Sequence, residues 1–115
     1  MTFERAIALD EIPEDEAVKV TIDRFDIALA RHGAEVFALQ DLCSHAAVAL
    51  SEGEVEDCTV ECWLHGSRFD LRTGKPTGLP ATEPVATFPV EVRDGDDGPE
   101  IWVDTTQTLN GVTPA

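Results

Sequence analysis

Two short clips of cysteine and histidine constrain this chain more than any other feature. Cys43 and His45 form the first clip, Cys62 and His65 form the second, and residues 46–61 separate them. Two thiolates and two neutral imidazoles can close a tetrahedral zinc site. They can also hold a two-iron, two-sulfur cluster, with both sulfurs on one iron and both imidazoles on the other. The donor set alone leaves both possibilities open.

The pairing of residue types within each clip carries more information than their number. Zinc fingers more often pair Cys with Cys and His with His. Here each clip mixes the two types, so each loop has to reach both metal positions. That arrangement suits a two-metal cluster held between two facing loops.

The residues around the clips resemble the Rieske family, whose pattern is C-x-H, a spacer of about this size, and C-x-x-H-G. The chain continues as that family does, with residues 66–71 reading G-S-R-F-D-L, then Thr73-Gly74, and a proline loop at Gly78-Leu79-Pro80-Ala81. The resemblance covers nearly the whole chain. In its small size and lack of a second domain, the chain looks like a Rieske-type ferredoxin rather than a Rieske oxygenase.

The resemblance implies a Rieske-type 2Fe-2S cluster, with Cys43 and Cys62 on the buried iron and His45 and His65 on the outer iron. It also implies a low-potential one-electron carrier that takes electrons from a flavin-dependent reductase and passes them to a terminal oxygenase. Such a carrier has no catalytic residues of its own. Two alternatives remain, namely an accessory Rieske subunit of another redox or iron-sulfur assembly system, and a structural zinc module.

Three residues beside the ligands are expected to support the cluster. The Ser67 hydroxyl and the Gly66 backbone N–H follow the last ligand, where they could donate hydrogen bonds to a cluster sulfur. Pro80 lies in the later loop, where proline lowers the entropy cost of holding a loop over a metal.

The resemblance also bears on the reduction potential. Rieske proteins of the respiratory complexes have two further cysteines that bridge the cluster loops, and a serine and a tyrosine that donate hydrogen bonds to sulfur. Here Val48 and Leu64 stand at the bridge positions and Phe69 at the tyrosine position, so only Ser67 remains. We therefore expect a midpoint near the lower end of the Rieske range, at about -150 mV.

The charge balance limits the partners. The chain has 23 acidic and 8 basic residues, for a net charge of -15. Nucleic acids and anionic membranes are poor partners for such a surface, whereas a basic protein surface is a good one. We expect docking at the cluster tip, through an apolar patch with an acidic rim. The patch would comprise Ala46, Ala47, Val48, Leu64 and Gly66, and the rim Glu52, Glu54 and Glu56.

The third cysteine, Cys58, has no role in the family pattern. With Cys43 and Cys62 assigned to the cluster, no intramolecular disulfide can form, which fits a reducing compartment. We interpret Cys58 as a small apolar strand residue that shares a face with Val60 and Cys62. Because no apolar run approaches the ~20 residues of a membrane span, we expect a soluble, cytoplasmic protein.

Strand signals dominate the rest of the chain. Val18, Val20 and Ile22 alternate with polar residues, and His32-Gly33 marks the turn of the following hairpin, with His32 an exposed turn residue. Strands are expected at 3–9, 17–23, 25–31, 35–39, 55–63 with a break near Asp57, 67–71, 85–92 and 100–104. The expected fold is an all-β antiparallel sandwich or barrel in one domain, residues 1–115. Cluster-binding loops at about 41–82 would form one tip, and 105–115 a flexible tail.

Overall fold

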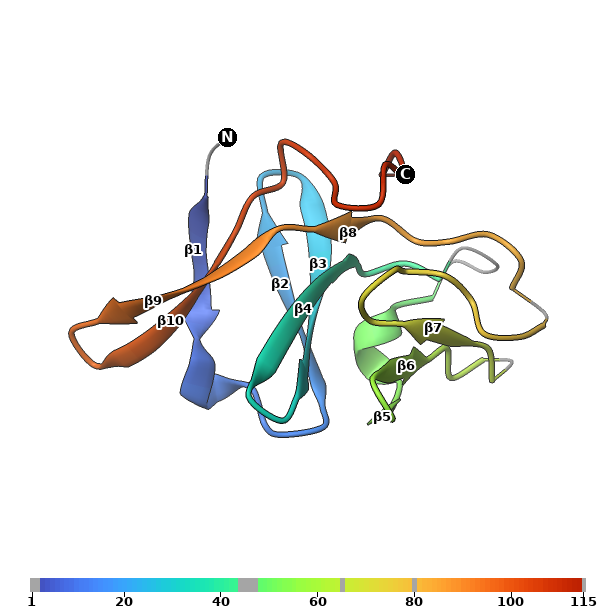
Figure 1. Ribbon diagram of the computed structural model, residues 1–115, viewed down its shortest axis with the longest axis horizontal. Coiled ribbons are helices and arrows are strands. Elements are labelled where there is room, and N and C mark those ends of the chain that lie inside the picture. Colours follow the sequence, from blue (N-terminus) through green and yellow to red (C-terminus); the bar gives the residue numbers. More distant parts are fainter. Residues whose placement is uncertain (1–2, 44–47, 65, 80, 115) are drawn as a thin grey trace.

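The computed structural model describes residues 3–43, 48–64, 66–79 and 81–114, and its strands form three antiparallel sheets in that part of the chain (Figure 1). One sheet contains β1 (Glu4–Ala8), β10 (Gly98–Val103) and β9 (Val90–Gly95). The second contains β2 (Ala17–Ile22), β3 (Phe25–His32), β4 (Glu35–Gln40) and β8 (Thr87–Phe88). The third contains β5 (Val55–Glu56), β6 (Thr59–Glu61) and β7 (Arg68–Asp70). The all-β prediction is confirmed.

Helical structure among the described residues is limited to two short 3-10 turns, η1 (Leu9–Glu11) and η2 (Leu50–Glu52). No helix in the described ranges has the length and apolar content to cross a membrane.

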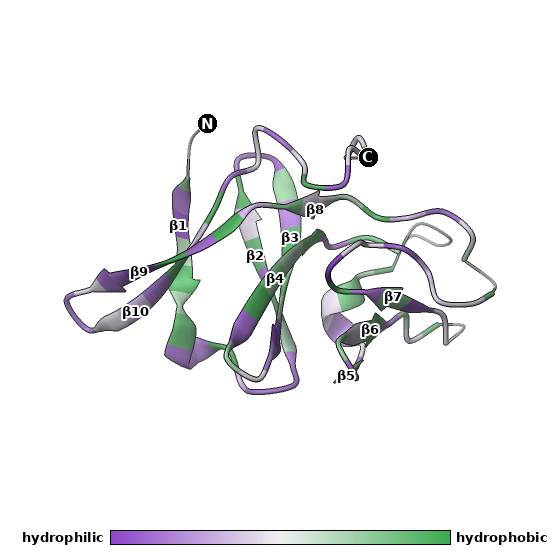
Figure 2. Ribbon diagram, in the orientation of Figure 1, coloured by the Kyte–Doolittle hydropathy of each residue, from purple (hydrophilic) through white to green (hydrophobic). Residues whose placement is uncertain are grey.

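The strand β3 is buried on both faces and divides the interior into two cores. Successive side chains of a strand point to opposite faces. Ile27 and Leu29 accordingly pack in one core, and Ala28 and Ala30 in the other. A continuous apolar run of this kind is typical of a strand covered on both sides. Its neighbour β4 is also mostly hydrophobic (Figure 2).

The first core, which we call the body core, contains residues of the first and second sheets and none of the third. Its buried members are Ile12, Ile22, Ile27, Leu29, Val36, Ala38, Ala86, Phe88, Ile101 and Val103. The second, which we call the ligand-side core, lies on the other face of β3. Its buried members are Ala28, Ala30, Leu39, Cys43, Leu50, Val55, Cys58, Val60, Cys62, Phe69, Leu71, Ala81 and Val85. Two of the four predicted ligands therefore belong to the same core.

Residues 85–92 were expected to form one strand, and that prediction is wrong. Pro89 separates β8, which pairs with β4, from β9, which pairs with β10. Proline has no N–H to give to a ladder, and the Pro89 carbonyl accepts a hydrogen bond from the Asp104 N–H at 3.2 Å. The interruption lets the chain leave one sheet and enter another (Figure 1).

The segment after β10 was expected to be a flexible tail, but its described part is tied to the second sheet. The Asn110 amide nitrogen donates to the carbonyls of Thr73 and Val85 at 2.9 and 2.8 Å. Its side-chain oxygen accepts from the Thr87 N–H at 3.3 Å, and the Leu109 N–H donates to the Thr87 carbonyl at 2.8 Å. These contacts of Asn110 could not be predicted from the low apolar content of the segment after β10.

Candidate metal centre

The cysteine of each clip lies in a connection between strands, Cys43 after β4 and Cys62 between β6 and β7 (Figure 1). Cys43 and Cys62 are 2% and 0% exposed, and neither forms a disulfide. The other two predicted ligands, His45 and His65, lie outside the described residues, as does Pro80. The structure therefore brings the two predicted sulfur donors into one core, while the imidazole ligands stay a prediction.

Both loops are closed in the same way at their cysteine. The Cys43 N–H donates to the Val48 carbonyl at 2.9 Å, and the Cys62 N–H donates to the Ser67 carbonyl at 2.6 Å. In each case the acceptor is five residues further along the chain. The two loops are thus matched in size, as the mixed pairing of ligands requires for two facing loops.

Gly66 turns the backbone after the second clip, and its hydrogen bond to a cluster sulfur stays a prediction. Its N–H donates to the Cys62 carbonyl at 2.9 Å, so this group already has an acceptor within the loop. Its φ of +78° lies in the left-handed region, where other residues are disfavoured. Glycine is therefore needed to turn the chain directly after the second clip.

Ser67 is buried, at 2% exposure, and connects the second clip to the proline loop. Its Oγ accepts a hydrogen bond from the Ala81 N–H at 3.0 Å. A hydroxyl that accepts through its oxygen still has its own proton to donate. The predicted hydrogen bond from Ser67 to a cluster sulfur is therefore compatible with this contact.

The buried cysteines fit a metal or cluster ligand set. Thiolates are the ligands of both zinc and iron-sulfur sites, and an apolar, water-poor surround is typical of the buried half of such a site. Across the described ranges there is no group of three or more His, Cys, Asp or Glu that could hold a competing metal ion. The two cysteine sulfurs can therefore bind one metal position. Other residues of the same two loops would supply the remaining ligands of the centre.

Cys58 lies in a turn, contrary to the prediction that it is a strand residue. Glu56 pairs with Thr59, so Asp57 and Cys58 form a two-residue hairpin loop, with φ values of 51° and 59°. Positive φ at both positions suits the right-handed twist of hairpin strands. The predicted break near Asp57 is therefore confirmed, while the strand register through Cys58 is wrong.

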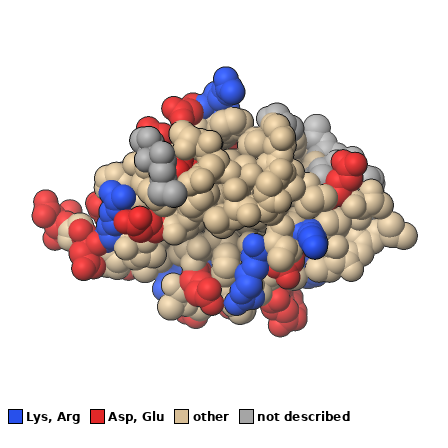
Figure 3. Space-filling view, turned by 45° about the horizontal axis from the view of Figure 1, so that its top comes forward, with Lys and Arg blue, Asp and Glu red and all other residues tan. Residues whose placement is uncertain are grey.

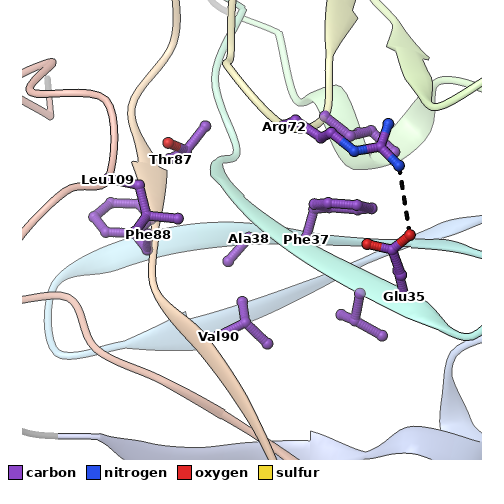
Figure 4. Close-up of a pocket in the computed structure, with 10 residues that line it drawn as sticks. Glu35, Phe37, Ala38, Arg72, Thr87, Phe88, Val90 and Leu109 are labelled. Carbon is purple, nitrogen blue, oxygen red and sulfur yellow. Dashed lines mark hydrogen bonds and ion pairs between the residues drawn. The ribbon is translucent and has the colours of Figure 1, made fainter.

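The Cys58 thiol remains an interior group. It is 8% exposed, and the Arg72 Nη1 donates to its Sγ at 2.8 Å. Arg72 also pairs with Glu35 at 3.4 Å, beside a cavity of about 310 Å³ lined partly by Phe37 and Leu71 (Figure 4). Neither Cys43 nor Cys62 lines that cavity. Burial raises the pKa of the Cys58 thiol, and the Arg72 charge offsets only part of this effect.

We expect Cys58→Ser to retain the full iron content of the wild-type protein. Because its pKa is raised, the Cys58 thiol should also react slowly with iodoacetamide at pH 7, where only the thiolate is nucleophilic. Iron analysis of the variant and mass spectrometry of the alkylated wild-type protein check the two expectations. Loss of half the iron in the variant would contradict the interpretation of Cys58 as a bystander.

Large apolar side chains are exposed at the loop end. Trp63 and Leu64, which follow Cys62, are 50% and 42% exposed, and Leu79 is 80% exposed. The loops that carry them are joined by the contact between Ser67 and Ala81. Leu64 was predicted in this patch, whereas Trp63 and Leu79 were missed, although both are apolar residues next to predicted site residues. We call Trp63, Leu64 and Leu79 the tip patch.

Val48 and the acidic rim can also be compared with the prediction. Val48 is half-buried against the ligand-side core, whereas Ala46 and Ala47 lie outside the described residues. Glu52, Glu54 and Glu56 are exposed, as expected. The loop end presents mainly uncharged atoms in Figure 3, while charged side chains gather elsewhere in the same view.

Comparison with known proteins gives consistent results. The model of the Rieske [2Fe-2S] domain matches residues 3–89. The anthranilate 1,2-dioxygenase ferredoxin subunit of Burkholderia cepacia is 49% identical over 88 residues, which is 76% of this chain and 82% of that protein.

Two solved structures are similar in fold and sequence. The ferredoxin of carbazole 1,9a-dioxygenase from Nocardioides aromaticivorans IC177 matches with a TM-score of 0.81 and 37% identity, over 90% of this chain and 97% of that one. A chain in a complex of reduced oxygenase and oxidised ferredoxin of carbazole 1,9a-dioxygenase matches with a TM-score of 0.83 and 30% identity. That match covers 93% of this chain and 96% of the other.

Proposed function

The chain belongs to the Rieske [2Fe-2S] domain family, and we propose that it carries single electrons to the terminal oxygenase of a ring-hydroxylating dioxygenase system. The observation that carries this proposal is the pair of buried cysteines in matched loops at the apolar end of the molecule. The 49% identity to a dioxygenase ferredoxin subunit supports the choice of partner.

The cysteines and the histidines would have different roles in holding the cluster. Cys43 and Cys62 would hold the cluster from the ligand-side core, and His45 and His65 would hold it from the outer side. When bound, the cluster supplies one-electron chemistry. Neutral imidazoles in place of two thiolates make such centres easier to reduce, at about -150 to +300 mV against about -400 mV for plant-type ferredoxins.

The ligand-side core excludes water from the cysteine side, because Cys43, Cys62, Phe69 and Leu71 are all at most 2% exposed. Electron exchange with a partner would therefore take place at the loop end, where the chain presents the tip patch. The proposal also includes a flavin-dependent reductase as electron donor and a cytoplasmic location. None of the three cysteines forms a disulfide, which supports a reducing compartment.

Anaerobic stopped-flow mixing tests the proposed function. The reduced protein should transfer one electron to an oxidised terminal dioxygenase from the same genome, and a flavin-dependent reductase should reduce it again. With a net charge of -15, transfer to a basic partner surface should slow as ionic strength rises from 0.01 M to 0.1 M and the screening length falls from ~30 to ~10 Å. Failure to reduce any such oxygenase would contradict the proposal.

We expect Trp63→Ala to weaken binding to the oxygenase by roughly ten- to a hundredfold. Half-exposed tryptophan in an apolar patch has the properties of an interface anchor, whose truncation often costs about 2 kcal/mol or more. Titration of the oxygenase by calorimetry measures the effect. Val92→Ala is the matched control, because Val92 is 51% exposed on β9, at the other end of the molecule (Figure 1). Equal affinity of the two variants would remove Trp63 from the docking surface.

A further inference from the structure

Asp41 is a buried carboxylate two residues before the first predicted ligand. Its side chain is 0% exposed, although aspartate is almost never fully buried without partners. The Ser51 N–H donates to its Oδ1 and the Ser51 hydroxyl to its Oδ2, both at 2.7 Å. Lys19 is more distant, with its Nζ 3.9 Å from Oδ2, and is itself half exposed.

These contacts close the base of the first ligand loop. Asp41 lies before Cys43, and Ser51 lies in η2, just after the loop. Ala49, the N-cap residue just before η2, has no side chain that can accept a hydrogen bond, so the Asp41 carboxylate satisfies the Ser51 N–H from across the loop. The Asp41 N–H donates to the Asp26 carbonyl at 2.8 Å, which anchors the same residue to β3. Asp41 therefore joins both ends of the loop to the second sheet.

The same carboxylate places a negative charge close to Cys43. Two residues of chain put it on the order of 10 Å from any metal held by the Cys43 thiolate. The Asp41 side chain is fully buried and Cys43 belongs to the ligand-side core, so screening by solvent ions is weaker than between surface charges. A negative charge in such a position disfavours the addition of an electron to the centre.

We propose that Asp41 is a positioning residue for the first ligand loop and that its buried charge lowers the reduction potential of the centre. The proposal rests on the proposed function, since it requires a redox cluster at Cys43 and Cys62. It separates two roles of one side chain, the hydrogen bonds that shape the loop and the charge that sets the potential.

Asp41→Asn separates these roles. The asparagine oxygen can still accept from the Ser51 N–H, and the amide can donate to the Ser51 hydroxyl, so the loop should keep its shape while the charge is removed. A unit charge about 10 Å away at an effective dielectric constant of about 20 changes a one-electron equilibrium roughly tenfold. The midpoint measured by protein-film voltammetry should therefore rise by ~59 mV. Iron content and the reduced-state EPR spectrum should match those of the wild type.

Two other variants complete the test. Ser51→Ala keeps the charge and removes one hydrogen bond, so the midpoint should stay near the wild-type value while the cluster is lost faster on heating, as followed by visible absorption. Glu52→Gln removes a neighbouring but exposed charge and should shift the midpoint much less than Asp41→Asn. If Asp41→Asn does not fold, Lys19→Met still tests the charge, because loss of the cation that faces Asp41 should lower the midpoint.

An unchanged midpoint in Asp41→Asn, with full iron content, would overturn the electrostatic role. Equal shifts in Asp41→Asn and Glu52→Gln would overturn it too, because the burial of Asp41 would then not matter. Absence of iron and sulfide from the wild-type protein is a different outcome. It would contradict the proposed function itself.

Discussion

Replacing His65 by cysteine should lower the midpoint by roughly 125 mV or more, about half the gap between Rieske and four-thiolate centres, and abolish the Rieske type of reduced-state EPR spectrum. The change converts one imidazole ligand into a thiolate and adds a negative charge to the centre. Rieske centres lie at about -150 to +300 mV, whereas plant-type ferredoxins with four thiolates lie near about -400 mV. Voltammetry and EPR of the dithionite-reduced variant measure the two effects.

The chain contains three histidines, and the third gives a matched control. His32 ends β3, outside both clips, and its Nδ1 lies 3.4 Å from the Asp15 carboxylate. His32→Cys should therefore leave both the midpoint and the spectrum unchanged. An unchanged spectrum in His65→Cys would mean that His65 is not a ligand.

Ser67→Ala should lower the midpoint by up to ~100 mV. A hydrogen bond to a charged group is worth about 1.5–3 kcal/mol, and ~59 mV corresponds to about 1.4 kcal/mol for one electron. The hydroxyl is buried and has a proton to donate, because the contact with Ala81 uses its oxygen as acceptor. The variant should also be less stable by about 1–3 kcal/mol, since the Ala81 N–H loses its acceptor. Voltammetry and thermal unfolding measure the two losses.

Phe69→Tyr is the complementary variant. Phe69 is fully buried in the ligand-side core and occupies the position at which high-potential Rieske proteins have a tyrosine. A hydroxyl there should raise the midpoint if it reaches a sulfur, opposite in sign to Ser67→Ala. A Ser67→Ala midpoint equal to that of the wild type would show that its hydroxyl gives no hydrogen bond to the cluster.

The strands that were predicted best are those with a clear alternation of apolar and polar residues. The prediction for 17–23 agrees with β2 at its start and extends one residue past its end, and the hairpin at Gly33 has the expected positive φ of 63°. The failures involve contacts that are distant in sequence. Pro89 divides the mostly apolar run at residues 85–92, and Asn110 holds the segment after β10 through partners 23 to 37 residues away. No local pattern encodes those partners.

For the site, the sequence predicts the ligand types and their spacing, and the structure adds the contacts of the described loop residues. The burial of Cys43 and Cys62 agrees with their assignment to the buried iron, which the family resemblance implies. The roles of Gly66 and Asp41 could not be predicted in this way. Gly66 uses its N–H within its own loop, and Asp41 acts through Ser51, which is ten residues away. In the sequence, the feature that points to Asp41 is its position as a charged residue two places before a predicted ligand.

The most direct test of the central claim is the metal and sulfide content of protein purified without oxygen. We expect two iron atoms and two acid-labile sulfides per chain, in agreement with the Rieske [2Fe-2S] family. A colourless protein with one zinc ion and no sulfide would contradict the account.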